Sequence, residues 1–339
     1  MAVGIVFFRG LSQAQDVAVK CWDGSTTLVT GGAGFVGTNV VRALLRAGAD
    51  VHCVVRPTTD LWRLQDVLGQ LTVHEHDLCD IALGPVVREL CPQVIFHLAA
   101  DGGHPDRRSE RLTATRSTVL GTANLLEALR SVPQAVLVHA GSMTEYGARD
   151  RPVRETDTLH PSIFRGALKA SSSLLVEQLS REAARQAVTV RLPAVYGPWE
   201  QADRFIPSVA MALLRDRKLA LTPARITRDY TFVEDVVAGL LTAGERAVAM
   251  ELPDWSNVIN LGTGGQTSNH RVVEVMEQLA GSSLRRASDA YAATAVDAAL
   301  PAIDITRAGT VLGWRPRYSL HAGLEETWSW FGRHAHRYP

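Results

Sequence analysis

The segment Thr30-Gly-Gly-Ala-Gly-Phe-Val-Gly37 joins a short β-branched run at residues 26–30 to a helical pattern at residues 37–47. Its glycines follow the spacing GxxGxxG: Gly31, Gly34 and Gly37. In such a turn the first glycine permits a tight bend, the second lets the backbone approach a pyrophosphate, and the third lets the helix lie close to the strand. The backbone N–H groups at Phe35 and Val36 would then face the phosphates. The strand–turn–helix context predicts a dinucleotide site; the alternative is a glycine-rich turn that holds no ligand.

Short β-branched runs continue to alternate with helical patterns along the chain. Strands are expected at residues 26–30, 50–55, 71–76, 94–97, 135–139 and 188–192, and helices at residues such as 37–47, 121–129 and 167–186. This alternation is typical of βαβ units, which place helices on both faces of a parallel sheet. We therefore predict an α/β fold with a Rossmann-type doubly wound parallel sheet. A smaller C-terminal α/β substrate lobe is expected where the pattern becomes less regular, after residue 196.

The predicted domain organisation follows from these changes of pattern. Residues 1–24 match no strong pattern and are expected to form an N-terminal extension. Residues 25–195 with about 229–262 would form an NAD(P)-binding Rossmann domain, and about 196–228 with 263–339 a substrate-binding lobe. A small-molecule substrate is expected in the cleft between the last two.

Composition excludes several classes of protein. The chain has 339 residues, and its 35 Lys and Arg residues balance 35 Asp and Glu residues, so no nucleic acid and no anionic membrane is expected as a partner. No apolar stretch approaches the roughly 18 residues that span a bilayer. The 4 cysteines are far apart, which indicates a reducing, cytoplasmic setting without disulfides. His74 and His76 have no third ligand near them in the sequence, so no metal site is expected.

The residue after the second predicted strand bears on the choice of cofactor. It is Arg56, 22 residues beyond Gly34. An NAD-binding protein favours an acidic residue there, which accepts hydrogen bonds from the ribose 2′-hydroxyl. An arginine suits a 2′-phosphate, because its planar guanidinium makes charge-assisted bidentate bonds. With Arg63 a short distance further on, we expect NADP(H) in preference to NAD(H); a solvated surface arginine is the alternative.

Further motifs follow the glycine turn in a recognisable order. They are Asp77-Leu78, His97-Leu-Ala-Ala100, Tyr196-Gly-Pro198, Arg228-Asp-Tyr-Thr-Phe-Val-Glu-Asp235 and Leu312-Gly-Trp-Arg-Pro316. Over about residues 25–333 the chain resembles the extended short-chain dehydrogenase/reductases, specifically the nucleotide-sugar epimerases, reductases and dehydratases. The resemblance implies further cofactor contacts from Asp77 and Leu78 beside the adenine, from Ala99 and Ala100 near the centre of the cofactor, and from Leu98, Pro193 and Lys169. It also implies a homodimer through helices near residues 107–129 and 166–186. A helix cap is the alternative role for Asp77.

The chemistry of that family uses a serine or threonine, a tyrosine and a lysine, the last two spaced YxxxK. By resemblance, Ser142 holds the substrate oxygen and Lys169 takes the place of the lysine. The residue four before Lys169 is Arg165, not tyrosine. An arginine stays protonated at any working pH, so it cannot act as an acid or a base. It can stabilise an oxyanion, or grip a carboxylate or phosphate of the substrate.

The spacing of Arg165 and Lys169 places both cations on one face of the predicted helix. Like charges so placed repel, and we expect the repulsion to lower the pKa of Lys169 until its amine becomes a usable proton donor. The alternatives are a solvated lysine and a position that has drifted in a protein without catalysis. His104, in the loop after the fourth strand, is a further candidate proton donor, since histidine titrates near neutrality; a solvated loop histidine is the alternative. Glu145 and Tyr196 are weaker candidates.

The expected substrate positions are altered as well. Thr118 and Ala194 stand where the family usually has asparagine, and residues 292–302 lack its usual diphosphate-binding arginine, whereas Arg228, the other usual diphosphate contact, is present. Met143 and Thr144 replace the acidic pair of the sugar dehydratases and the glutamate of related decarboxylases, so those two activities are not expected. Thr144 remains a candidate substrate contact.

These features lead to a functional hypothesis with open alternatives. The chain is predicted to be an NADP(H)-binding enzyme that reduces or epimerises a (nucleotide-)sugar or a related keto or polyol compound, through an atypical Ser-Arg-Lys centre. The alternatives are a non-redox isomerase, cyclase or lyase that acts on an anionic substrate, and an inactive binding subunit of the same fold. The glycine turn and Lys169 favour an enzyme, whereas Arg165, Thr118 and Ala194 favour the alternatives.

Overall fold

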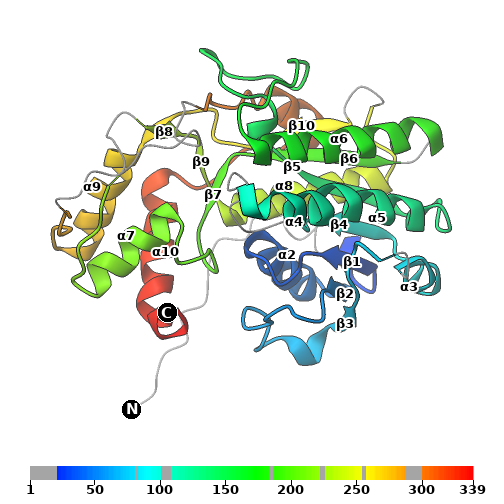
Figure 1. The fold of residues 1–339 in the computed structure, drawn as a ribbon, viewed down its shortest axis with the longest axis horizontal. Coiled ribbons are helices and arrows are strands. Elements are labelled where there is room, and N and C mark those ends of the chain that lie inside the picture. Colours follow the sequence, from blue (N-terminus) through cyan, green and yellow to red (C-terminus); the bar gives the residue numbers. More distant parts are fainter. Residues whose placement is uncertain are drawn as a thin grey trace.

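A parallel sheet of 7 strands forms the centre of the molecule, in the order β10-β6-β5-β4-β1-β2-β3 (Figure 1). The computed structural model describes residues 21–80, 83–100, 108–183, 186–221, 226–253, 257–287 and 300–338. The strands of the sheet are β1 (Thr26–Thr30), β2 (Asp50–Val55), β3 (Thr72–Glu75), β4 (Val94–His97), β5 (Val136–Ser142), β6 (Ala187–Leu192) and β10 (Val258–Asn260). All neighbouring pairs in it run parallel. The predicted Rossmann-type α/β fold class is confirmed.

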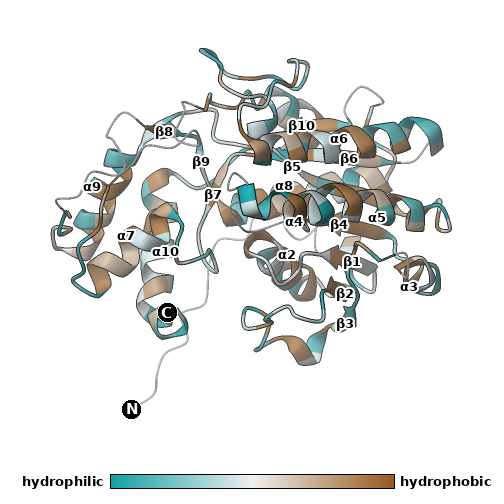
Figure 2. Ribbon diagram, viewed as in Figure 1, coloured by the Kyte–Doolittle hydropathy of each residue, from teal (hydrophilic) through white to brown (hydrophobic). Residues whose placement is uncertain are grey.

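Helices cover both faces of this sheet. On one face lie α2 (Phe35–Arg46) and α8 (Val233–Val248), and on the other lie α3 (Leu83–Leu90), α5 (Gly121–Leu129) and α6 (Phe164–Ala183). Successive strand residues point to opposite faces, so Leu28 and Val29 of β1 enter two separate apolar layers. Both side chains are fully buried, as expected for a parallel sheet covered on both sides. Figure 2 shows the hydrophobic residues gathered on the strands and on the adjoining helices.

The strand order creates a crevice at one edge of the sheet. The chain leaves β1 toward β2 and β3, and then returns to β4 on the other side of β1. Connections that diverge in this way leave a gap at the carboxyl ends of the two central strands, where open α/β sheets bind ligands. The glycine turn follows β1 and the His97–Ala100 segment follows β4, so both motifs lie at this crevice.

A smaller lobe lies beside the sheet. It contains α7 (Phe205–Leu214), α9 (Asn269–Ala280) and α10 (Leu320–His334), which pack against one another (Figure 1). Two short strand pairs accompany them: β7 (Ala194–Tyr196) is parallel to β9 (Tyr230–Phe232), and β8 (Thr227–Arg228) is antiparallel to β11 (Thr267–Ser268). The remaining short helical turns are η1 (Leu68–Gln70), η2 (Arg108–Glu110), α4 (Arg111–Thr115), η3 (Arg116–Leu120), η4 (Met143–Glu145), η7 (Ala308–Leu312) and η8 (Ala335–Arg337). The smaller lobe agrees with the less regular sequence pattern after residue 196.

The described part of the chain contains neither a membrane-spanning helix nor a group of side chains suited to a metal ion. None of its helices is both long and apolar enough to cross a bilayer. No three of its His, Cys, Asp or Glu side chains are grouped so as to hold a metal ion. The sequence analysis did not identify His52 as a neighbour of His74. In the structure His52 Nδ1 lies 2.9 Å from His74 Nε2, across β2 and β3.

Candidate functional site

The glycine turn after β1 has a backbone that only glycine can form. Gly31 has a φ of +73°, and a Cβ added there would lie 2.7 Å from the backbone nitrogen of Ala99. A Cβ on Gly37 would lie 2.0 Å from the carbonyl oxygen of Gly31. The first glycine therefore lets the turn touch the β4 loop, and the third lets α2 start directly against the turn. The roles predicted for these two glycines agree with this geometry.

The start of α2 is a place where an anion fits. Gly34 is its N-cap residue and makes no side-chain cap hydrogen bond to the first N–H groups of the helix. The first N–H groups of a helix have no intrahelical acceptor, so those of Phe35 and Val36 are left to a ligand. The positive end of the helix dipole adds to the attraction for a phosphate. Together with the missing Cβ atoms, this end of α2 suits the pyrophosphate of a dinucleotide.

A chain of buried hydrogen bonds holds the β4 loop against the glycine turn. The Ala99 N–H donates to Thr30 Oγ1 at 3.4 Å, and Thr30 Oγ1 lies 2.7 Å from His97 Nδ1. His97 Nε2 lies 2.9 Å from Thr122 Oγ1, whose hydroxyl donates to the Thr118 carbonyl. Burial, with a smaller contribution from Lys169, lowers the pKa of His97 to about 3, so this imidazole is neutral. Leu98 and Ala99 are thereby fixed beside the turn, and the exposed Ala100 follows them.

The residues predicted to border the adenine take two different positions. Asp77 Oδ1 accepts a hydrogen bond of 2.8 Å from the N–H of Cys79, so it closes a local turn. Leu78 is buried, and its carbonyl accepts a bond of 3.0 Å from the Asn124 amide. A Cβ on Gly121 would lie 3.1 Å from the Leu78 Cβ, so α5 packs closely on this loop. Asp77 therefore forms a local turn and not the helix cap considered as its alternative role, because the next helix, α3, begins only at Leu83. Its contact with the adenine stays a prediction.

The two arginines expected to read a 2′-phosphate differ in the structure. Arg56 is exposed after β2 and has no ion pair with a described residue. Arg63 is engaged: its Nε donates to the Trp199 carbonyl at 2.8 Å and its Nη1 to the Ala33 carbonyl at 3.5 Å. Burial lowers its pKa. Arg63 therefore braces the glycine turn against the segment after β7, a role that the sequence did not indicate.

The candidate reaction centre lies at the carboxyl end of β5. Ser142 is the last residue of that strand and caps η4, with its Oγ 2.8 Å from Thr144 Oγ1. The first turn of α6 comes very close, because a Cβ on Gly166 would lie 2.4 Å from the Thr144 carbonyl oxygen. Arg165, the neighbour of Gly166, is therefore next to this turn. The structure brings Ser142, Thr144 and the start of α6 together, an arrangement that the family resemblance implied; the catalytic roles of these residues stay predictions.

Lys169 lies one helical turn further along α6. Its Nζ donates a hydrogen bond of 2.8 Å to the Ala140 carbonyl of β5. Burial lowers the pKa of this amine to about 8, with Glu145 opposing the shift and Arg165 adding to it. The direction agrees with the expectation from the Arg165–Lys169 spacing, although desolvation contributes more than the repulsion between the two cations. A substantial neutral fraction of Lys169 is thus present near pH 8.

Tyr146 and Tyr196 both lie in the interior of the fold. Tyr146 is fully buried, donates to Asn260 Oδ1 at 2.7 Å and accepts from Arg191 Nη1 at 2.8 Å. Burial raises the pKa of Tyr146 to about 12. Tyr196 is also buried, with its hydroxyl 3.4 Å from the Leu320 carbonyl. Both phenols belong to the packed interior.

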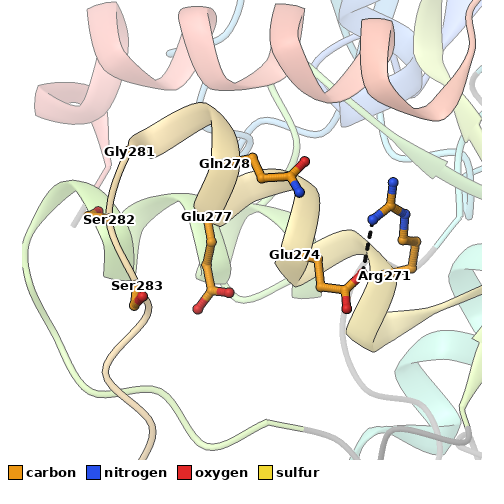
Figure 3. A pocket seen from close by; sticks show the side chains of 7 residues that line it. All are labelled: Arg271, Glu274, Glu277, Gln278, Gly281, Ser282 and Ser283. Carbon is orange, nitrogen blue, oxygen red and sulfur yellow. Dashed lines mark hydrogen bonds and ion pairs between the residues drawn. The ribbon is translucent and has the colours of Figure 1, made fainter.

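The other predicted site residues are scattered. Arg228 lies in β8, and its Nη1 donates to the Thr227 carbonyl at 2.8 Å. Pro193 lies between β6 and β7, with its carbonyl bonded to the Val195 N–H. His104 lies outside the described residues. A surface hollow of about 490 Å³ lies elsewhere, on α9 of the smaller lobe, where Arg271 pairs with Glu274 (Figure 3). That hollow contains none of the predicted site residues.

The fold and the glycine turn define a dinucleotide-binding α/β protein, and comparison with known proteins identifies its family. Residues 27–262 match the model of the NAD dependent epimerase/dehydratase family, and the chain belongs to this family. The predicted resemblance to nucleotide-sugar epimerases and dehydratases is confirmed at this level.

Several relatives cover almost the whole chain. The UDP-glucuronate 4-epimerase of Thermodesulfobacterium geofontis is 26% identical over 89% of this chain and 95% of its own length. The dTDP-glucose 4,6-dehydratase 1 of Escherichia coli is 28% identical over 90% of this chain and 92% of its own. Among solved structures, MoeE5 in complex with UDP-glucuronic acid and NAD is similar with a TM-score of 0.79, at 29% identity, over 91% of this chain and 99% of that one. The UDP-glucose 4-epimerase of Thermotoga maritima, with UDP-glucose, gives 0.82 at 25% identity, over the same shares.

These relatives bear on the cofactor. MoeE5 binds NAD, so a nicotinamide cofactor is supported, but the predicted preference for NADP(H) is not. The prediction treated Arg56 and Arg63 as a pair of phosphate ligands. Arg63 instead donates hydrogen bonds to two carbonyl oxygens, so of the two arginines at most Arg56 is left to contact a 2′-phosphate.

Proposed function

We propose that this protein binds NAD and epimerises a nucleotide-sugar at a carbon that carries a hydroxyl group. The observation that carries the proposal is the position of Lys169 and Ser142 at the carboxyl end of β5, in the same sheet as the anion-binding turn after β1. The relatives that are named UDP-sugar epimerases support the substrate class. NAD is proposed over NADP because the solved relatives contain NAD.

The residues present divide the chemistry between a base and a fixed cation. A bound nicotinamide would supply the hydride acceptor and donor for oxidation and re-reduction of the sugar carbon. The neutral amine of Lys169 accepts the proton of the sugar hydroxyl during oxidation, and its ammonium form returns that proton on reduction. Arg165 cannot exchange a proton, so it stabilises the oxygen while negative charge develops there. Ser142 donates a hydrogen bond to the same oxygen. The proton that Lys169 accepts returns to the sugar. Inversion requires the ketone to be reduced from the opposite face, and the reaction then has no net redox change.

The rate of turnover should rise with pH as Lys169 loses its proton and becomes able to act as a base. With Lys169 titrating at about 8, the neutral amine forms as the pH rises. We expect the epimerisation rate at saturating substrate to increase from pH 6 to about pH 9, through a midpoint near the Lys169 pKa. The measurement is NMR of the sugar product with NAD and either UDP-glucose or UDP-glucuronate at a series of pH values.

Calorimetric titration with NAD and with NADP, together with the NMR assay, separates the competing functions. If calorimetry detects no binding of NAD or NADP, the redox proposal is wrong. If NAD binds but neither sugar is converted at any pH, the chain is a binding subunit or acts on a different substrate class. Tighter binding of NADP than of NAD would support the contact between Arg56 and a 2′-phosphate that the sequence predicts.

We also propose that the protein is a homodimer. Exposed leucines lie on neighbouring helical segments, with Leu112 of α4 81% exposed, Leu120 of η3 40% and Leu174 of α6 56%. The α4 and η3 segments pack against α6, so these leucines offer apolar area for a second copy.

The oligomeric state tests this interface. We expect Leu174→Glu to convert the dimer to a monomer in light scattering, because the interface would bury a carboxylate without a partner. Met250→Glu, at a more exposed position after α8, should leave the dimer intact. A wild-type protein that is already monomeric at micromolar concentration would contradict the proposal.

A further inference from the structure

A buried carboxylate lies directly behind the candidate reaction centre. The Glu145 side chain is 0% exposed. Its Oε1 accepts hydrogen bonds from the Ser142 N–H at 2.7 Å and from the Ser173 hydroxyl at 3.0 Å. Its Oε2 accepts from Arg191 Nε at 2.8 Å. The carboxylate therefore joins the end of β5, the helix that carries Lys169, and β6.

The residues around this carboxylate leave space for it and pair with its charge. A Cβ on Gly141 would lie 2.7 Å from Glu145 Oε1 and 3.1 Å from the Arg191 side chain, so only glycine leaves room for the pair. Arg191 is itself only 4% exposed and makes a second bond, to the Tyr146 hydroxyl. Tyr146 in turn bonds to Asn260 of β10. A buried ion pair costs solvation, and this one is compensated by a full set of hydrogen bonds.

Glu145 also differs in charge from the other groups that face Lys169. Arg165 on α6 is a cation. His97 of β4 and His139 of β5 stack with ring centroids 5.2 Å apart, and burial lowers the pKa of both, so they are neutral. Arg191 of β6 is a cation already paired with Glu145. Among the described groups that influence the lysine, Glu145 supplies the negative charge.

We propose that Glu145 is a positioning residue, which acts on the reaction through two other groups. Its carboxylate fixes the Ser142 turn, and through the Ser173 hydroxyl it places a negative charge against α6 one helical turn from Lys169. The catalytic part of this inference rests on the proposed function. The electrostatic part concerns the resting protein and can be tested without any substrate.

The test measures the titration of Lys169 directly. The chain contains only Lys20, Lys169 and Lys218, so a Lys20→Arg, Lys218→Arg background leaves Lys169 as the single lysine. Its rate of acetylation by acetic anhydride, followed by peptide mass spectrometry from pH 6 to 11, gives the pKa of the amine. Adding Glu145→Gln keeps the size of the side chain and removes its charge. We expect the Lys169 pKa to fall by about one unit, as the loss of a nearby opposite charge requires.

A matched control separates this role from simple loss of stability. Asp235, on α8, is a buried carboxylate that accepts bonds from the backbone N–H groups of Arg317 and Tyr318. Asp235→Asn should lower the melting temperature but leave the Lys169 titration unchanged. If Glu145→Gln gives that same pattern, the proposal is overturned. Should Glu145→Gln fail to fold, Glu145→Asp is measured in its place, and the retreat of the charge by one methylene should still lower the Lys169 pKa measurably.

Turnover gives a second readout once a substrate has been found. In Glu145→Gln the rising limb of the pH–rate profile should move to lower pH together with the Lys169 pKa. The value of kcat should fall by more than KM changes, because the Ser142 turn exchanges a charged acceptor for a weaker, neutral amide oxygen. Absence of turnover in the wild type would count against the proposed function alone, since the labelling experiment does not use it.

Discussion

Gly37→Ala is expected to abolish useful binding of the dinucleotide and to destabilise the protein. The new Cβ would lie 2.0 Å from the Gly31 carbonyl oxygen and 2.9 Å from the Gly32 Cα. Both are backbone atoms, so no rotamer change can relieve the clash and the turn must move away from α2. Overpacking of this kind costs about 3 kcal/mol of stability. A displaced turn also loses one or two N–H contacts to phosphate, each worth about 1.5–3 kcal/mol, which corresponds to roughly 100-fold weaker binding.

Calorimetric titration with NAD and a thermal melt measure the two effects. Gly84→Ala is the matched control, because Gly84 is also a glycine near the start of a helix, α3, and a Cβ there would have no atom within 4 Å. That control should bind NAD normally and gain about 0.4–1 kcal/mol of stability, since alanine restricts the unfolded chain. Normal binding in Gly37→Ala would show that the glycine turn does not hold the cofactor.

Lys169→Met should remove nearly all turnover without unfolding the protein. Loss of a general acid–base group typically slows a reaction about 10²–10⁴-fold. Burial disfavours the charged amine, as the lowered pKa shows, so an apolar side chain of similar length removes an unfavourable desolvation. The melting temperature at pH 7 should therefore stay the same or rise, which separates this loss of activity from misfolding.

The pH dependence of stability provides an independent check on the same residue. The folded protein releases the Lys169 proton at about pH 8, whereas the unfolded chain keeps it to the ordinary lysine pKa of 10.5. Between those values the unfolded state binds more protons, so this group makes the protein more stable as the pH rises. Lys169→Met should lose that increase. Lys218→Met, at an exposed site, should keep both activity and the pH dependence. An Lys169→Met variant that retains more than about a tenth of wild-type turnover would exclude the lysine as the base, since a general base contributes at least about 10²-fold.

Local sequence patterns were sufficient to predict the strands of the sheet and the glycine turn on the cofactor side of the candidate site. The predicted strands at residues 26–30, 50–55 and 94–97 coincide with β1, β2 and β4. Residue 142, predicted only as a site residue, proved to be the last residue of β5. These features depend on short-range physics, because strand periodicity, glycine torsion angles and the start of a helix involve residues that are neighbours in the chain. The pairing of Ser142 with α6 came from resemblance to the family.

Tertiary packing decided the roles of charged side chains whose partners are distant in sequence. Arg63 was expected to bind phosphate, but its partner is the carbonyl of Trp199, 136 residues away. Glu145 was a weak candidate for proton transfer, but Arg191, 46 residues away, holds it as a buried ion pair. The sequence by itself determined the α/β fold and the glycine turn after β1, because those are encoded in periodicity and backbone freedom. Only the tertiary structure decided which charges are buried and paired, because desolvation and hydrogen bonding depend on what the fold packs against each group.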